Sequence, residues 1–280
     1  MAAGISAPYT VRLRPVGTCI YCGSTAGRLT DEHIIPQGLG GTLVLGKASC
    51  DPCAQVTSRF EMNALRGFLD HGRQALGIKG RKNHRRERQE SVPQTFLLSD
   101  KTLKNGAASL DQSVRVMHLP VFVLPAFLDP ARPISIREGI EVMAIDTAMF
   151  GPAENSVVRE PGAVGMQFND RMDIVAFGRM LAKIAHGYHV AIHGLFPLEE
   201  SPLLPIILGK RWDAHNWIGN TEHEPLPSDR SALHLLQHLP LEADDGIAGM
   251  AVRIKLFAYF PSPTYALATR LHPMPPHVDY

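Results

Sequence analysis

The sequence contains neither a long apolar run nor a segment typical of an export signal. Its most apolar stretch, residues 116–128, is interrupted by one histidine and two prolines, whereas a membrane-spanning helix needs roughly 20 consecutive apolar residues. The first 15 residues carry Arg12 and Arg14 where a secretory signal would be apolar. We therefore expect a soluble, cytoplasmic protein with no membrane partner.

Cysteine is absent from the last 227 residues, because all four cysteines lie between residues 19 and 53. A disulfide-stabilised secreted protein would distribute them more widely, and in a reducing compartment such a cluster indicates a metal. They form two Cys-x2-Cys pairs separated by 27 residues, and paired thiolates bind zinc tetrahedrally. A redox dithiol is the alternative, although redox enzymes use one such pair. We predict a structural, non-catalytic Zn²⁺ bound by Cys19, Cys22, Cys50 and Cys53.

The chain has almost no net charge, +1, but its charges are segregated. Residues 1–90 carry a balance of +6, and residues 91–280 carry a balance of −5. This separation indicates that the N-terminal part contacts a polyanion, with chance segregation as the alternative. Residues 79–88 hold six basic side chains, which would contact phosphates or, alternatively, form a solvated hinge. The predicted nucleic-acid-binding residues are Lys79, Arg81, Lys82, Arg85, Arg86 and Arg88.

The order of predicted elements favours an α+β protein with two domains, residues 1–90 and residues 91–280. Short strands are expected around residues 12–23, 28–36 and 42–45, and apolar residues at helical spacing follow over residues 54–78. Beyond the basic run the pattern is mostly of strands, interrupted by one amphipathic helix over residues 171–195. The strands expected there span residues 95–98, 114–124, 140–145, 164–168, 204–208, 233–236, 251–259 and 264–269.

Between the cysteine pairs lies an adjacent acid and histidine, Glu32 and His33, followed by a proline and a glycine-rich turn. Hydrolysis of a phosphodiester needs a base to activate water and a divalent cation to neutralise charge. A histidine base beside a carboxylate ligand would provide both. An isolated pair is also typical of an ordinary strand end, so the surrounding cysteines are what give it significance.

Four segments in this order resemble the HNH endonuclease family in its four-cysteine form. They are Cys-Ile-Tyr-Cys-Gly at 19–23, Asp-Glu-His-Ile-Ile-Pro at 31–36, Leu-Gly-Gly at 39–41 and Ala-Ser-Cys-Asp-Pro-Cys at 48–53. The resemblance, which covers about residues 17–65, implies a zinc-bound ββα-metal module. The resemblance also implies His33 as general base, Glu32 as ligand of a catalytic Mg²⁺ or another divalent cation, and the four cysteines as zinc ligands. The pattern of strands beyond the basic run predicts that a larger α+β domain rich in antiparallel strands follows the module.

The chain departs from this family where an Asn or His commonly completes the catalytic metal site. The corresponding positions are Ala54 and Ser58, which are poor ligands. Glu61 is three residues beyond Ser58, on the same predicted helix face, and is the expected replacement. Weaker candidates are Gln55, Thr57 and Asn63.

These observations predict an HNH endonuclease, a metal-dependent hydrolase that cuts phosphodiester bonds of DNA, with RNA left open. Residues 91–280 would select the target, sense a signal or mediate assembly, as in bacterial or phage defence nucleases; this part is analogy. The alternative is a catalytically degenerate zinc-binding module that binds nucleic acid or acts as an adaptor. The sequence leaves the oligomeric state undetermined.

A second group of histidines, His186, His189 and His193, falls on one side of the predicted helix at spacings of three and four. Such spacing suits metal binding. No carboxylate or cysteine accompanies them, so an ordinary polar helix face is the favoured interpretation.

Overall fold

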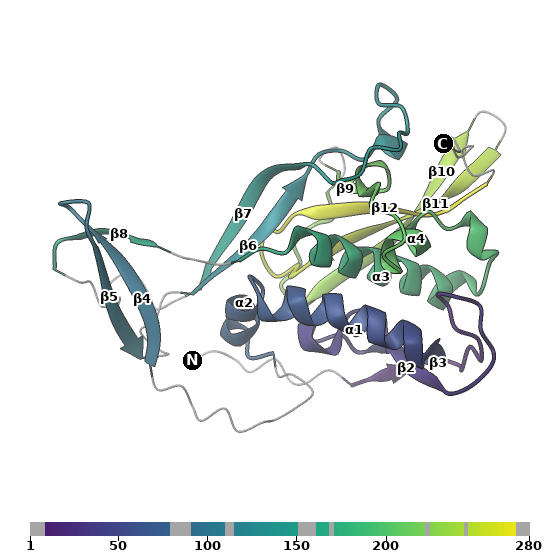
Figure 1. Ribbon diagram of the computed structural model, residues 1–280, viewed down its shortest axis with the longest axis horizontal. Helices are drawn as coiled ribbons and strands as arrows, with labels where there is room; N and C mark the ends of the chain where they lie inside the picture. Colours follow the sequence, from purple (N-terminus) through teal and green to yellow (C-terminus); the bar gives the residue numbers. More distant parts are fainter. Residues whose placement is uncertain are drawn as a thin grey trace.

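The computed structural model describes residues 9–78, 91–109, 115–150, 161–167, 171–221, 225–243 and 246–272 (Figure 1). The fold is α+β, as predicted. The basic run at residues 79–88 lies outside the described residues, so its predicted phosphate contacts stay a prediction. Within the described part, no helix is both long and apolar enough to cross a membrane.

The N-terminal module is a β-hairpin followed directly by a helix. Strand β2 (Leu29–His33) pairs antiparallel with β3 (Leu43–Cys50), and the short β1 (Val11–Arg12) pairs parallel with β3. The turn between β2 and β3 contains the 3-10 helix η1 (Gln37–Leu39). This turn requires glycine at Gly41, because a Cβ atom there would lie 1.9 Å from the Ile35 carbonyl oxygen. The predicted order of strand, loop, strand and helix is confirmed.

Helix α1 (Asp51–Arg66) is shorter than predicted, and α2 (Asp70–Ala75) follows it as a separate element. One continuous helix was expected over residues 54–78. The chain leaves helical geometry at Gly67 (ψ −131°), where a Cβ atom would lie 3.0 Å from the Arg171 carbonyl oxygen. The distant segment at Arg171 therefore approaches closely at the point where α1 ends.

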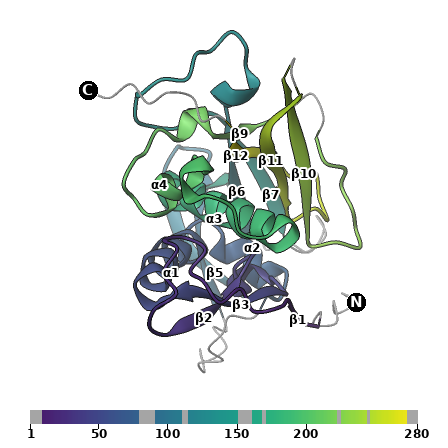
Figure 2. The same ribbon diagram turned by 90° about the vertical axis from the view of Figure 1, so that its right-hand side faces the viewer.

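Helix α3 (Ile174–His193) lies at the centre of the molecule, between the N-terminal module and the C-terminal strands (Figures 1 and 2). Asp173 caps its start by accepting a hydrogen bond from the Ala176 backbone N–H at 2.9 Å. The helix packs against α1 on one side and against β11 and β12 on the other. Because both sides are covered, thirteen of its residues are buried, which an amphipathic surface helix would not show.

Among the described residues beyond the basic run, the strands form three antiparallel sheets. The largest, in the order β10-β11-β12-β9, packs on α3, whereas the sheet of order β5-β4-β8 stands apart at the left of Figure 1. The third sheet pairs β6 with β7. The strands are β4 (Ser91–Leu98), β5 (Leu103–Ser109), β6 (Arg115–Phe122), β7 (Val142–Phe150), β8 (Ala163–Gln167), β9 (Ile218–Asn220), β10 (His234–Ala243), β11 (Gly246–Leu256) and β12 (Thr264–Leu271).

Short elements beyond the basic run also differ from the sequence expectation. Residues 204–208, expected as a strand, belong to the short helix α4 (Leu203–Ile207), which packs on α3. A short apolar run suits a buried helix as well as a strand, and its surroundings decide between them. Strand β5 was not predicted, because it has few β-forming side chains and is held mainly by backbone pairing with β4.

The hydrophobic core extends without a break across both parts of the chain. One cluster of buried side chains includes Ile34 and Phe60 from the N-terminal module, Phe177 from α3, and Tyr265 and Leu267 from β12. The predicted boundary near residue 90 falls in a segment outside the described residues and stays a prediction. The N-terminal module and the C-terminal part share this core around α3.

Candidate functional site

Four thiols converge at one end of the N-terminal module; we call Cys19, Cys22, Cys50 and Cys53 the thiol cluster. Their sulfur atoms all lie within 4.8 Å of one another, and none is in a disulfide. The Sγ atoms of Cys22 and Cys50 are 3.6 Å apart, close to the edge of about 3.8 Å expected for a zinc tetrahedron with bonds of about 2.3 Å. The cluster could therefore hold a metal ion such as zinc.

Local backbone structure brings the two cysteine pairs together. Gly23 takes a left-handed conformation (φ +73°) and donates its N–H to the Cys19 carbonyl oxygen at 2.9 Å, which closes the first knuckle. Cys50 ends β3, and Cys53 lies in the first turn of α1. Burial raises the pKa of the Cys53 thiol, so a cation is needed to favour the thiolate form that binds zinc.

The acid and histidine at the end of β2 face different surroundings. Glu32 is buried, whereas His33 and its neighbour Asp31 are more exposed. Alternation along a strand places Asp31 and His33 on one face and Glu32 on the other. The Arg12 guanidinium hydrogen-bonds to Asp31 and, with a smaller contribution from His33, holds the pKa of this carboxyl below its usual value.

A lysine from α3 lies between Glu32 and Glu61; we call Glu32, Glu61 and Lys183 the carboxylate–lysine site. The Lys183 Nζ atom is 2.6 Å from Glu32 Oε1 and 2.9 Å from Glu61 Oε1. It also donates a hydrogen bond to the His33 carbonyl oxygen. The structure thus brings together the two carboxylates predicted as metal ligands, and an ammonium group bridges them.

This site is buried and electrostatically coupled. The Lys183 side chain is 1% exposed, against 9% for Glu32 and 19% for Glu61. Burial alone would lower the pKa of Lys183, but the two carboxylates raise it above its usual value. Burial raises the pKa of Glu61, and Lys183 partly offsets this increase. The ammonium therefore stays charged between the two carboxyl groups.

Tyr21 adds a polar group beside this site. Its hydroxyl is buried and has no hydrogen-bond partner among the described residues. Burial, together with the nearby Glu32 and Glu61 carboxylates, raises its pKa well above the usual value. The phenol therefore stays neutral and lies next to the Glu32 and Glu61 carboxyl groups.

As it stands, the carboxylate–lysine site does not fit a divalent cation. Lys183 lies between the only two carboxylates that converge there, and its charge opposes a second cation. Within the described residues, the thiol cluster is the one group of three or more His, Cys, Asp or Glu side chains close enough to share an ion.

The helix positions considered for the missing ligand do not supply one. Ala54 has no donor atom, and Ser58 donates its hydroxyl to the Gln55 carbonyl oxygen at 3.1 Å. Thr57 likewise donates to Ala54 at 3.2 Å, and the Asn63 amide donates to Asp173 at 3.4 Å. Among the residues named from the sequence, only Glu61 reaches Glu32 through a shared partner.

Sequence reasoning did not identify Lys183. One signal was present, because the lysine stands in the run Met-Leu-Ala-Lys-Ile-Ala of a helix rich in apolar residues. A buried lysine requires a partner. The sequence could not identify that partner, because the His33 carbonyl oxygen that accepts its hydrogen bond lies 150 positions earlier.

The histidines of α3 connect the helix to its neighbours. His186 is fully buried and its Nε2 atom is 2.7 Å from the Ile20 carbonyl oxygen, in the first cysteine knuckle. His189 Nδ1 lies 2.9 Å from Thr269 Oγ1, whereas His193 is exposed. Burial lowers the pKa of His186 to about 4 and that of His189 to about 3. The favoured interpretation of a polar helix face was therefore wrong for His186 and His189.

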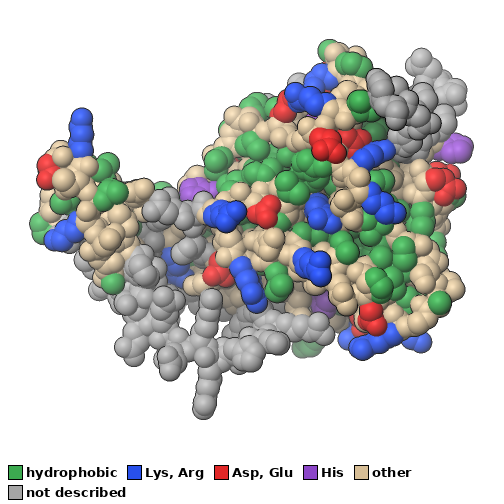
Figure 3. Space-filling view, in the orientation of Figure 1, with side chains coloured by type: hydrophobic (Ala, Val, Ile, Leu, Met, Phe, Trp, Pro, Cys, Tyr) green, Lys and Arg blue, Asp and Glu red, His purple; other side chains and the backbone are tan. Residues whose placement is uncertain are grey.

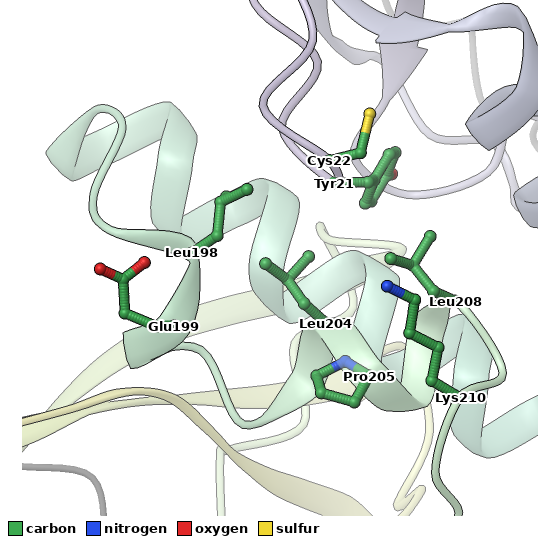
Figure 4. A pocket seen from close by; sticks show the side chains of 8 residues that line it. All are labelled: Tyr21, Cys22, Leu198, Glu199, Leu204, Pro205, Leu208 and Lys210. Atoms are coloured by element: carbon green, nitrogen blue, oxygen red, sulfur yellow. The ribbon is translucent and has the colours of Figure 1, made fainter.

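An open cavity of about 300 Å³ lies where the first cysteine knuckle meets the segment around α4. Figure 4 shows Tyr21 and Cys22 on one side, facing Leu198, Leu204 and Lys210 on the other. Most of its lining is apolar. Cys22 is the exposed member of the thiol cluster, while the other three cysteines are buried.

A β-hairpin and helix with four converging thiols and an acid–histidine pair at a strand end define a ββα module of the nuclease type. Residues 19–67 match the family model described as HNH endonuclease. The match ends well before the C-terminal sheets. Searches of curated proteins and of solved structures found no match.

The surface shows no single basic patch on the face drawn in Figure 3, where lysines and arginines are scattered among acidic and apolar side chains. This view does not test the basic run at residues 79–88, which lies outside the described residues.

Proposed function

We propose that this protein is an HNH-type endonuclease that hydrolyses phosphodiester bonds of DNA, with RNA as the alternative substrate. The observation that carries the proposal is the family match over residues 19–67, a segment that contains the thiol cluster and His33 at the end of β2. Structural Zn²⁺ in the thiol cluster would hold the hairpin and α1 in place.

His33 is the proposed general base, which takes a proton from the attacking water. Asp31 lies two residues before His33 on β2, and its hydrogen bond with Arg12 holds the pKa of this carboxyl below its usual value. A carboxylate there stabilises the imidazolium that forms when His33 accepts the proton. A Mg²⁺ or similar ion at Glu32 and Glu61 remains a prediction.

The experiment is a plasmid-nicking assay with His33→Ala across several divalent cations. Loss of a general base typically costs about 10²–10⁴ in rate without affecting ground-state binding. His193→Ala is the matched control, because this histidine is exposed and far along the chain from the module. If His33→Ala cuts DNA as fast as the parent protein, the assignment is wrong.

A second candidate is a catalytically degenerate module that binds nucleic acid or acts as an adaptor without cutting. Lys183 favours it, because the ammonium neutralises part of the charge that would attract a catalytic cation. This candidate predicts DNA binding without nicking in Mg²⁺, Mn²⁺ or Zn²⁺, for both the parent and His33→Ala.

The roles of residues 91–280 and the setting of the activity are part of the same proposal. The C-terminal part would select the target, sense a signal or mediate assembly, in a cytoplasmic defence function. Helix α3 supports a role in control, because it belongs to the C-terminal part and contacts both carboxylates of the module.

A further inference from the structure

Lys183 occupies the position that a shared cation would take between Glu32 and Glu61. One oxygen of each carboxylate lies within 3 Å of its Nζ atom, at 2.6 and 2.9 Å. A divalent ion bound to both carboxylates sits about 2.0–2.2 Å from their oxygens. An ion bound to these same two oxygens would contact the ammonium group, so the two cations exclude each other.

The ammonium has polar partners on several sides. Its Nζ atom forms ion pairs with Glu32 and Glu61 and donates a hydrogen bond to the carbonyl oxygen of His33. The last contact connects Lys183 to the backbone of the proposed base. Displacing Lys183 would therefore cost three charge-assisted contacts in a buried setting.

The surrounding packing restricts the lysine to this position. Its side chain is 1% exposed, and α3 has thirteen buried residues packed between α1 and the large sheet. Arg179, one turn earlier, lies 4.9 Å from the centre of the Phe60 ring of α1. The helix cannot shift without breaking the core that both parts of the chain share.

We infer that Lys183 sets the divalent-cation affinity of the carboxylate pair: it is the resident cation of this site and competes with Mg²⁺ or Mn²⁺. The inference rests on the proposed function only for its effect on cleavage. With Lys183 in place, a nuclease would need a higher concentration of divalent cation to fill this site than the same two carboxylates would need without the lysine.

The test measures Mn²⁺ binding directly, by titration calorimetry of the full chain with its thiol cluster loaded with zinc. Lys183→Met removes the charge but retains an unbranched apolar stem, and it should bind Mn²⁺ at least about tenfold more tightly than the parent. Lys183→Arg retains the charge and should bind as weakly as the parent. If Lys183→Met binds no more tightly than the parent, the inference is wrong.

A further variant locates the ion. Adding Glu61→Gln to Lys183→Met removes one carboxylate of the pair, so the gain in Mn²⁺ affinity should disappear. A gain that persists in the double variant would place the ion elsewhere and would overturn the inference.

Folding is controlled separately, because Lys183→Met leaves two buried carboxylates facing each other. An ion that binds only the folded state raises Tm, so about 10 mM Mn²⁺ should raise the Tm of Lys183→Met more than that of the parent. If Lys183→Met is unfolded in chelator, Mn²⁺ should restore the fold. An equal or smaller rise, or no recovery, contradicts the inference.

Nicking separates this inference from the proposed function. Tighter Mn²⁺ binding by Lys183→Met, with no cleavage by any variant, would support the role of Lys183 and reject the nuclease. Cleavage that depends on His33, with equal Mn²⁺ affinity in parent and Lys183→Met, would do the reverse.

Discussion

The thiol cluster and the carboxylate–lysine site are two polar centres of one module, and the chain builds them differently. The thiol cluster uses four residues from positions 19–53, held by one glycine knuckle, a strand end and the first turn of α1. The carboxylate–lysine site needs Lys183, which comes from a helix far along the sequence. The first centre is therefore local, whereas the second exists only when α3 docks.

The largest expected effect on stability comes from disrupting the thiol cluster, which is the local centre. Cys50→Ser should remove the metal from the thiol cluster, and structural zinc sites contribute on the order of 10 kcal/mol to folding. Metal analysis should find about one zinc per parent chain and none in the variant, and thermal unfolding should show a much lower Tm.

The thiol cluster is also connected to α3, so the effect of losing zinc should extend beyond the cluster itself. Because Ile20 in the first knuckle accepts a hydrogen bond from His186, loss of zinc should also loosen the contact with α3. Ser24→Ala, in the same loop but not a ligand, is the control and should keep both zinc and Tm. Zinc-free parent protein that unfolds at an unchanged Tm would contradict a structural role for the ion.

The next largest effect concerns the docking of α3. It appears as a dependence of the free energy of unfolding on pH. Burial lowers the pKa of His186 to about 4 in the folded protein, against about 6.5 when unfolded. Between these values the unfolded state binds the proton and the folded state does not, so stability is lost as pH falls from about 6.5 to about 4. For this single residue the loss should be about 3 kcal/mol, since one pKa unit is about 1.4 kcal/mol.

Urea unfolding of the parent and of His186→Gln at pH 7 and pH 4 measures this loss. The glutamine retains an N–H donor for the Ile20 carbonyl but does not titrate, so the acid loss should shrink by about 3 kcal/mol. His272→Gln is the control, because that side chain is 74% exposed. An equal acid loss in His186→Gln and in the parent would show that this contact does not titrate.

The smallest effect per residue concerns the basic run, whose role rests on the sequence alone. Replacing Arg81, Lys82, Arg85 and Arg86 with Gln should weaken binding to all DNA sequences alike. Each lost phosphate contact should reduce the slope of log affinity against log salt by about 0.9. The measurement is DNA affinity over a range of salt concentrations, and an unchanged slope would identify the run as a solvated hinge.

Much of the module was accessible from the sequence because its signals are local. The two cysteine pairs predicted a cluster, and residues around His33 predicted the hairpin and the HNH family. The apolar pattern over residues 171–195 predicted α3. In each case the determining contacts lie within a few turns or one hairpin, so residue spacing carries them.

The partners of buried charges were decided only by tertiary structure. Glu61 was chosen for its helix face, and the structure does bring it near Glu32, but through an ammonium from α3. The end of α1 at Gly67 likewise depends on the Arg171 backbone approaching it. Sequence spacing determines which side chains share an element, whereas the packing of distant elements determines which charges meet.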